Sequence, residues 1–349
     1  MRFALSEDQA LLRDSTRAFC ERELPLERTR VVMEHAREGY EPGPWRQLAE
    51  MGYLGLPLPA SAGGQGLGAI ELAVVCEELG RVCAPGPYLD AVLAASLLAV
   101  AGREALAAEV AAGRRLVVLA RHDSPWGGVP AAPVRLAGGR VRGTKYFVPF
   151  AAAADALLVT TPAGVALVEA PFATTPLETI DLAQRFGAVT LDHAAALVGP
   201  PDLLEDVDRL AAVGAAATLL GVMTRSLELT LDYVRTRHAF NRPIGAFQAL
   251  QHRMADMLLR TESTRSAVYR AAWCRDAGAP ETVLACAAAK AYAGDAARMV
   301  CGSAIQLHGG IGFTWELDLH VFFKRAKTLE QHYGATETQL ARALAAAGY

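Results

Sequence analysis

Long apolar runs are scarce in this chain of 349 residues. The longest, residues 91–102 (AVLAASLLAVAG), is bounded by Asp90 and Arg103 and falls short of the roughly 20 apolar residues that a membrane-spanning helix needs. The first residues, MRFALSEDQALLRDSTRAF, carry acids and have no apolar core of the kind found in signal peptides. We therefore expect a buried helix near residues 91–102, no membrane association and a cytoplasmic location.

Cysteine is also rare, and no two cysteines form a Cys-x-x-Cys pair. This scattered spacing suits neither a zinc site nor a disulfide framework, so we expect no metal centre. Cysteines of this kind are typically small buried apolar residues of a reducing cytoplasm. The six are Cys20, Cys76, Cys83, Cys274, Cys286 and Cys301.

An excess of positive charge is absent too. The chain has 34 basic and 37 acidic side chains, a net charge of −3, and therefore no basic field that would bind nucleic acid or an anionic membrane. Aromatic residues make up only 7% of the chain, but 52% of all residues are hydrophobic, which is enough for a sizeable core. A chain of this length usually forms two or three packed units.

Helical periodicity dominates both ends of the chain. After the glycine-rich stretch GGQGLG, Ile70, Val74 and Leu79 fall near helical spacing, which predicts a helix that starts there. A second apolar period, beyond residue 200, predicts long antiparallel helices that form a bundle. It includes Leu250, Met254, Met257 and Leu258.

The middle of the chain has the pattern of strands. RLVVLA, from Arg115, is a short β-type run, and hairpin signals follow around Gly138-Gly139 and around Pro162 and Gly164. Helices, strands and helices in this order predict an α+β fold with segregated blocks. The expected parts are an N-terminal helical domain (1–112), a small antiparallel β domain (113–200) and a C-terminal helical bundle domain (201–349).

Residues 235–251, RTRHAFNRPIGAFQALQ, form the first candidate site. Arg237 and Arg242 bracket Phe240, Pro243 interrupts what would otherwise be one helix, and Gln248 opens the next. An arginine at a helix end beside a helix start suits a phosphate or pyrophosphate. The alternative is a plain helix–loop–helix connection with solvated arginines, and spacing alone favours it.

Residues 306–316, QLHGGIGFTWE, form the second candidate site. Gly309 and Gly310 allow close backbone approach to a ligand, and the amide of Gln306 supplies both a donor and an acceptor. A helix C-cap followed by a turn explains the same glycines, so the pattern alone leaves both interpretations open.

Three segments together resemble hallmark motifs of the acyl-CoA dehydrogenase family, in the family's order along nearly the whole chain. Residues 58–81 (LPASAGGQGLGAIELAVVCEELGR) are similar to its Gly-Gly-x-Gly turn and the helix ending Glu-Glu-Leu-Gly-Arg. Residues 235–257 are similar to its Arg-x-x-Phe-Gly-x-Pro-Ile block, with Asn241 in place of the usual glycine. Residues 304–327 (AIQLHGGIGFTWELDLHVFFKRAK) resemble its Gln-x-x-Gly-Gly-x-Gly stretch.

The resemblance implies a fold, a reaction and a cofactor. The C-terminal domain becomes a four-helix bundle, with FAD between it and the β domain. The reaction is α,β-dehydrogenation of an acyl-CoA thioester, in which a base removes the α proton, the β hydride passes to the flavin, and an electron-transferring flavoprotein takes the electrons. The residues carried over as cofactor-binding contact an FAD held mainly by the neighbouring subunit: Arg237, Phe240, Ile244, Gln248, Gln306, Gly309 and Gly310.

The departures from the family fall on the other half of its site. Tyr333 stands where the family has its catalytic glutamate, and a phenol, which titrates near pH 10, is a poor base at neutrality. Some members place the glutamate on the first long C-terminal helix, where this chain has Ala211 and the nearest carboxylate is Asp208. Asp208 is thus a catalytic candidate, and an ordinary acid near a helix start explains it as well.

Two further departures concern the flavin ring and the substrate. Residues 120–130 (ARHDSPWGGVP) lack the family's Thr-Glu-Pro-x-Ala-Gly-Ser-Asp pattern. In the segment GTKYFVPF, Phe147 replaces the family's tryptophan and Pro149 its threonine, so a side-chain donor near the flavin is lost.

Taken together, the sequence leads to the hypothesis of a partner subunit without the catalytic base. Such a chain would complete FAD binding for a homologous catalytic subunit in an α2β2 assembly, as in the acyl-CoA dehydrogenases of bacterial steroid side-chain degradation that it resembles. One alternative is a self-sufficient homo-oligomeric dehydrogenase with a displaced base, for which Asp208 is the candidate. Another is a binding or scaffold protein without redox activity.

Overall fold

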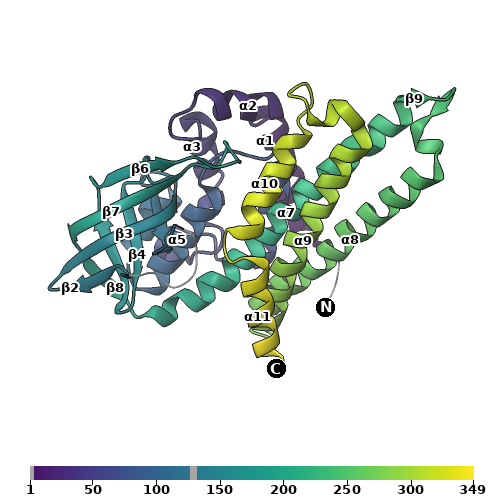
Figure 1. Ribbon diagram of the computed structural model, residues 1–349. Helices are drawn as coiled ribbons and strands as arrows, with labels where there is room; N and C mark the ends of the chain where they lie inside the picture. Colours follow the sequence, from purple (N-terminus) through teal and green to yellow (C-terminus); the bar gives the residue numbers. More distant parts are fainter. Residues whose placement is uncertain (1–3, 126–131) are drawn as a thin grey trace. The chain divides into compact units, whose positions relative to one another are not determined.

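A computed structural model describes residues 4–125 and 132–349 (Figure 1). Helices occupy the chain up to Ala111, strands extend from Val117 to Gly199, and helices return from Leu204. This order confirms the expected α+β class, with helices at both ends and a central sheet region.

The α-helices are α1 (Glu7–Glu23), α2 (Leu26–His35), α3 (Pro42–Glu50), α4 (Ala69–Arg81), α5 (Tyr88–Val100), α6 (Glu104–Ala111), α7 (Leu204–Thr236), α8 (Gln248–Asp276), α9 (Thr282–His308), α10 (Leu319–Gln331) and α11 (Thr336–Ala346). The strands are β1 (Val117–Ala120), β2 (Arg135–Ala137), β3 (Arg140–Pro149), β4 (Ala156–Thr161), β5 (Gly164–Glu169), β6 (Ala173–Leu177), β7 (Phe186–Ala194), β8 (Ala196–Gly199), β9 (His238–Ala239) and β10 (Arg242–Pro243). Short 3-10 helices are η1 (Tyr53–Gly55), η2 (Ala60–Ala62), η3 (Pro201–Leu203), η4 (Ile244–Ala246) and η5 (Gly309–Phe313).

The described residues divide into two compact units. The first consists of the segment up to Thr29, Ala69–Ala84 and Arg209–Tyr349, and the second of Arg30–Gly68 and Pro85–Asp208. Each unit therefore combines part of the N-terminal helices with a later block of the chain. The domain ranges 1–112, 113–200 and 201–349 stay a prediction.

The second unit contains two four-stranded sheets, with the strand orders β1-β4-β5-β8 and β2-β3-β7-β6. Both expected hairpins are present, because β2 pairs with β3 across Gly138-Gly139 and β4 pairs with β5 across residues 162–163. One pair departs from the antiparallel expectation, since β1 runs parallel to β4. The chain between these two strands first builds β2 and β3 of the other sheet, and this long connection allows the parallel return.

In the first unit, α9 packs against α8, α10 and α11. Buried alanines such as Ala289, Ala293 and Ala297 line α9 and permit close packing of its neighbours. Met257 on α8 is buried as its spacing indicates, but Leu258 is 51% exposed, so the apolar period placed one residue too many on the inner face.

The helix that follows the glycine-rich stretch, α4, crosses α7 closely within the first unit. A Cβ atom on Gly80 would collide with the backbone of Thr218, and one on Gly221 would collide with the carbonyl oxygen of Glu77. The N-terminus of α4 is capped by Asp276 from the end of α8, whose carboxylate accepts hydrogen bonds from the amides of Ala69 (2.7 Å) and Ile70 (3.1 Å). Such a cap satisfies amides that the helix itself leaves unpaired.

Helix α7 is long and apolar enough to cross a membrane by length and composition. Its most apolar window within Pro201–Thr236 has a mean hydropathy of 1.5, and 83% of that window is buried inside the protein. The core helix of a globular protein has the same properties, and the burial favours that interpretation. The expected helix near residues 91–102 is α5, which is likewise mostly buried.

Candidate cofactor-binding site

The segment between α7 and α8 is a β-hairpin. Strands β9 and β10 pair through Arg242 with Ala239 and Pro243 with His238. Phe240 and Asn241 form its turn with φ angles of +51° and +62°. Asparagine tolerates this left-handed conformation better than most residues, which explains how it can replace the family's glycine. The sequence predicted only a loop here.

Arg237 and Phe240 both face solvent. Phe240 is 89% exposed, and its ring meets the ring of Phe247 edge-on at 6.1 Å. The guanidinium of Arg242 lies over Phe247 at 4.1 Å. The guanidinium of Arg237, which follows directly after α7, forms no ion pair with any residue that the structure describes. The hairpin therefore presents an aromatic ring and an unpaired cation, as a phosphate-bearing cofactor would need.

The next two predicted residues lie where the chain enters α8. Ile244 opens the 3-10 helix η4, and its amide donates to the carbonyl oxygen of Arg237 (2.8 Å). Gln248 is the first residue of α8 and is exposed. The side chain of Gln251 donates to the carbonyl oxygen of Gly245 (3.0 Å), which fixes the bend between η4 and α8.

Gln306 shares a cavity with the start of α8. The cavity has a volume of about 440 Å³ and is lined by Ala249, Leu250, Arg253, Gln306 and Leu307. It brings together the two segments that the sequence singled out separately. Arg253 is a residue that the sequence analysis missed, and its guanidinium has no ion-pair partner within the described residues.

The end of α7 is tied to the end of α9 by two stacked rings. Tyr233 and His308 lie 4.2 Å apart with a 22° angle between the rings, and the Tyr233 hydroxyl donates to the carbonyl oxygen of His308 (3.4 Å). Burial lowers the pKa of His308, against the effect of its hydrogen bond to the carbonyl oxygen of Ala304. A neutral, stacked imidazole is therefore a structural group that holds the Arg237 end of α7 beside Gly309.

The three glycines after α9 differ in what disfavours a side chain at each position. Gly312 packs so closely on the carbonyl oxygen of Ile305 that no side chain would fit. Gly309 has a φ of +66° and a ψ of −143°, a conformation that side chains disfavour. Gly310 has neither constraint, since an added Cβ would meet nothing within 4 Å. Close approach of a group from outside the chain would explain its lack of a side chain, and this fits a bound cofactor.

Tyr333 lies in the turn between α10 and α11. It has a φ of +60° and is followed by Gly334 with a φ of +99°. The rings of His332 and Tyr333 are in contact at 3.9 Å. The turn therefore carries a phenol at the position to which the sequence resemblance assigns the family's carboxylate.

Asp208, the other catalytic candidate, forms an ion pair with Arg121 within the second unit. The carboxylate is therefore already engaged by a guanidinium from β-region residue Arg121. Its position one turn into α7 also agrees with the alternative of an ordinary acid near a helix start. The pairing thus gives no support to a catalytic role.

The two altered segments of the β region can be described in part. Of residues 120–130, positions 126–130 lie outside the described residues. Phe147 has a φ of +48° at an irregularity of β3, and its ring meets those of His122 (6.5 Å) and Phe186 (6.4 Å) edge-on. Pro149 occupies a place in the ladder with β7, opposite Phe186. The surroundings of Phe147 are aromatic, and Pro149 adds no donor.

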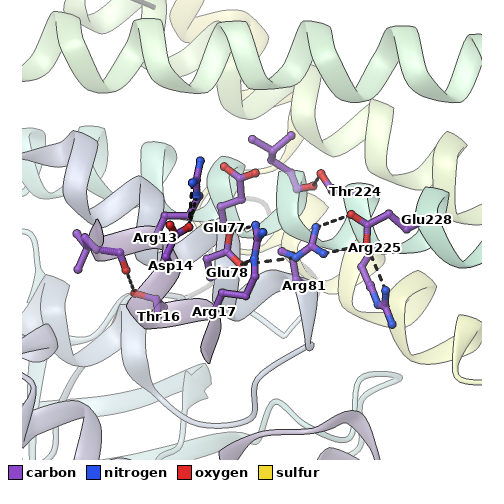
Figure 2. A network of polar contacts seen from close by, with 12 residues as sticks. Arg13, Asp14, Thr16, Arg17, Glu77, Glu78, Arg81, Thr224, Arg225 and Glu228 are labelled. Carbon is purple, nitrogen blue, oxygen red and sulfur yellow. Dashed lines mark hydrogen bonds and ion pairs between the residues drawn. The ribbon is translucent and has the colours of Figure 1, made fainter. Parts of the chain in front are cut away.

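A network of charges joins α1, α4 and α7 within the first unit (Figure 2). Arg17 donates two hydrogen bonds to Glu78 (2.9 and 2.8 Å), and Arg81 donates two to Glu228 (2.9 and 2.8 Å). Burial opposes ionisation of Glu228, but hydrogen bonds from Arg81 hold its pKa below the usual value. Arg225 adds a third guanidinium at 3.2 Å from Glu228.

The neighbouring Glu77 connects α4 to α8. It pairs with Arg265 and accepts a hydrogen bond from the hydroxyl of Tyr269 (2.8 Å). A cavity of about 520 Å³ adjoins the network, with Arg17, Glu78, Arg81 and Arg225 in its wall. Because these carboxylates are already held by arginines, we interpret the network as a structural clamp and not as a catalytic centre. Within residues 4–125 and 132–349, no three potential ligands gather around a metal position.

Comparisons with known proteins show to which family the chain is similar. Residues 6–112 match the N-terminal domain of acyl-CoA dehydrogenases, and residues 209–348 match their C-terminal domain. The chain is 34% identical to acyl-CoA dehydrogenase IpdE2 of Mycolicibacterium smegmatis, over 97% of this chain and 98% of that protein. It is 33% identical to acyl-CoA dehydrogenase FadE27 of Mycobacterium tuberculosis, over 85% and 86% of the two chains.

Solved structures agree as well. The ChsE4-ChsE5 complex from Mycobacterium tuberculosis includes a chain with a TM-score of 0.90 and 30% identity, covering 100% of this chain and 99% of that one. A variant of the Tcur3481-Tcur3483 steroid ACAD gives the same TM-score and identity over 98% of both chains. The chain therefore belongs to the acyl-CoA dehydrogenase family, flavoprotein oxidoreductases that act on the CH–CH bond of acyl-CoA thioesters.

Proposed function

We propose that this chain is the partner subunit of an unequal acyl-CoA dehydrogenase, in which it binds FAD together with a homologous catalytic subunit and supplies no base. The observation that carries the proposal is an asymmetry within the first unit. The groups that could hold a phosphate-bearing cofactor, Arg237 and Gly310, are exposed and open, whereas position 333 carries a phenol.

In this proposal, each of the predicted cofactor-binding residues contacts a particular part of FAD. Arg237 binds the pyrophosphate, Phe240 packs against the cofactor, and Ile244 and Gln248 lie along its adenosine side. Gln306, Gly309 and Gly310 contact its far end. When bound, FAD supplies the hydride acceptor. The chain's own contribution is to orient the cofactor and to neutralise its charge.

The proton chemistry then belongs to the other subunit. Dehydrogenation requires a base at the α carbon, and a positioned base contributes about 10²–10⁴ in rate. Tyr333 is a poor base at neutral pH, and Asp208 is held by Arg121. A catalytic subunit with the family's glutamate would fill this role in an α2β2 assembly.

The names of related proteins support the kind of assembly and of substrate. Two structural relatives at 30% identity are a steroid ACAD variant and a two-protein ChsE4-ChsE5 complex. We accordingly propose a bulky, steroid-derived acyl-CoA substrate and an electron-transferring flavoprotein as the electron acceptor. We also propose a reducing cytoplasm as its location, with which the buried cysteines are consistent, since none of the six forms a disulfide.

The test is to purify the chain alone and with a homologous dehydrogenase that has the family's glutamate, and to record the flavin spectrum and turnover of acyl-CoA. We expect little flavin and no turnover for the chain alone, and both for the complex. Full flavin occupancy with turnover by the chain alone would contradict the proposal and favour a homo-oligomeric enzyme. Absence of flavin in every pairing would favour a binding or scaffold protein.

A further inference from the structure

The buried lysine of α9 stands apart from the other lysines of the chain. Lys290 is 0% exposed, and its ammonium group has no carboxylate within ion-pair distance among the described residues. It donates instead to two backbone carbonyl oxygens, those of Gly334 (2.9 Å) and Glu330 (3.3 Å). Burying a cation is costly, and hydrogen bonds to polar acceptors such as these carbonyl oxygens offset part of that cost.

Both acceptors belong to the last turn of α10 and the turn that follows it. Carbonyl oxygens at a helix C-terminus lack partners within the helix and carry partial negative charge, which favours a nearby cation. The side chain of Glu330 is occupied by other groups, namely Lys327 (2.5 Å) and Arg298 (3.2 Å). Lys290 is thus the cation that binds the backbone at this helix end.

A second buried side chain, from another helix, holds the same turn. Gln339 on α11 is 1% exposed, and its amide donates to the carbonyl oxygen of Tyr333 (3.0 Å). Tyr333 and Gly334 are therefore held by donors from α9 and from α11, one on each carbonyl oxygen. Tyr333 keeps a left-handed φ of +60°, which a residue other than glycine adopts only when its surroundings require it.

We infer that Lys290 is a positioning residue that, with Gln339, fixes the backbone at position 333. The turn that carries the base in the family is then present in this chain. Tyrosine replaces glutamate at position 333, but the backbone at that position is fixed by Lys290 and Gln339. This inference depends only on contacts within the first unit. It goes beyond the proposed function, because it holds whether or not the chain pairs with a catalytic subunit.

The test follows the Tyr333 ring directly in the full chain. The chain is labelled with 3-fluorotyrosine, and its ¹⁹F resonance from Tyr333 is assigned by its loss in Tyr333→Phe. We expect one sharp resonance in the wild type, and a shifted or split resonance in Lys290→Met under conditions where the variant is folded. Lys327→Met is the matched control, since it removes an ammonium that binds the Glu330 side chain and not the turn.

Hydrogen exchange gives an independent measurement of the same turn. Amides of residues 332–335 should exchange about tenfold faster in Lys290→Met and in Gln339→Leu, and at the wild-type rate in Lys327→Met. If Lys290→Met does not fold, reductive methylation of the wild type decides instead, since Lys290 should resist labelling that modifies Lys327. An unchanged Tyr333 resonance and unchanged exchange in folded Lys290→Met, or methylation of Lys290 as fast as that of Lys327, would overturn the inference.

Discussion

Lys290 should also make the stability of the protein depend on pH. Burial lowers its pKa from 10.5 to about 8, with Glu330 acting in the opposite direction. Between these two values the unfolded chain binds a proton that the folded chain has released. Stability rises with pH wherever the unfolded state binds more protons, so the cost of burying this amine decreases from pH 8 to pH 10.5.

We therefore expect the free energy of unfolding of the wild type, relative to Lys290→Met, to rise by up to ~3 kcal/mol between pH 7.5 and pH 10.5. Denaturant unfolding of both proteins at several pH values measures this difference and cancels the titration of tyrosines and cysteines. Lys327→Met, whose lysine is partly exposed, is the control and should show no comparable rise. If the difference in free energy of unfolding between the wild type and Lys290→Met does not change with pH, the pKa of Lys290 in the folded protein is not lowered.

Arg253 offers a second test at the scale of one residue. It shares a cavity with Gln306 and has no ion-pair partner within the described residues. A guanidinium with free donors in such a place should bind an anionic or polar part of the cofactor. We expect Arg253→Ala to weaken flavin binding by the assembled protein about tenfold, or ~1.4 kcal/mol, with Arg253→Lys intermediate.

The control for this prediction lies on the same helix. Arg270 is also an exposed arginine of α8, but it is far along the helix from the cavity. Arg270→Ala should leave the flavin dissociation constant unchanged, as measured by fluorescence quenching. Equal effects of the two substitutions would show that only the general charge of α8 matters.

Single residues differ in how far the sequence could predict them. The motifs led directly to Arg237, Gly309 and Gly310, because an arginine at a helix end and the spacing of glycines can be recognised in the sequence itself. Arg253 and Lys290 were missed, since their importance arises from which helix packs beside α8 or α9. A lysine in an alanine-rich helix is normally expected at the surface, and nothing local to its sequence indicates the carbonyl oxygens that it meets.

At the scale of elements, the crossing of α4 and α7 depends on two glycines. Glycine in a helix normally costs about 1 kcal/mol relative to alanine, so its presence at both contact points needs a packing reason. That reason is backbone contact, between Gly80 and Thr218 and between Gly221 and Glu77. The contact also brings Glu77 and Glu78 within reach of α1 and α8, where the charge network forms (Figure 2).

Gly221→Ala should accordingly lower the free energy of unfolding by about 2–3 kcal/mol through overpacking, despite the better helix propensity of alanine. Gly302 on α9 is the matched control, because a Cβ there would meet only Phe323 at an ordinary 3.7 Å. Gly302→Ala should be neutral or slightly stabilising in the same denaturant experiment. A neutral Gly221→Ala would mean that the two helices can separate without loss.

Strands and hairpins were predicted where the sequence signal for them lies within a few neighbouring residues. The two hairpins of the sheet region followed from Gly138-Gly139 and from residues 162–164, because tight turns need particular residues. The parallel pairing of β1 with β4 could not be predicted, since it depends on where a long connection returns. The β9–β10 hairpin was missed because two-residue strands carry too short a pattern to detect.

For the whole molecule, the periodicity of apolar residues and the hairpin signals predicted the order of helices and strands, but not the division into compact units. Each unit contains segments that are far apart in sequence, and such association is set by packing surfaces and not by local pattern. A site shared with another chain is harder still to predict. Its signature here is indirect, namely the exposed ring of Phe240 and the guanidinium of Arg237, which has no ion-pair partner in the described part of the chain.

If FAD is shared between this chain and a catalytic subunit, the complex should hold one flavin for each pair of chains, and Arg237 should be needed for it. We expect Arg237→Gln to weaken flavin binding by the complex by ~1.5–3 kcal/mol, about 10- to 100-fold, because a charge-assisted bond to phosphate is lost. Flavin released from a known amount of denatured complex measures the content. Arg235→Gln is the matched control, since Arg235 is also exposed, lies two residues earlier and faces Asp232 (3.6 Å). Two flavins per pair of chains, or equal losses in both variants, would contradict a cofactor completed by this chain.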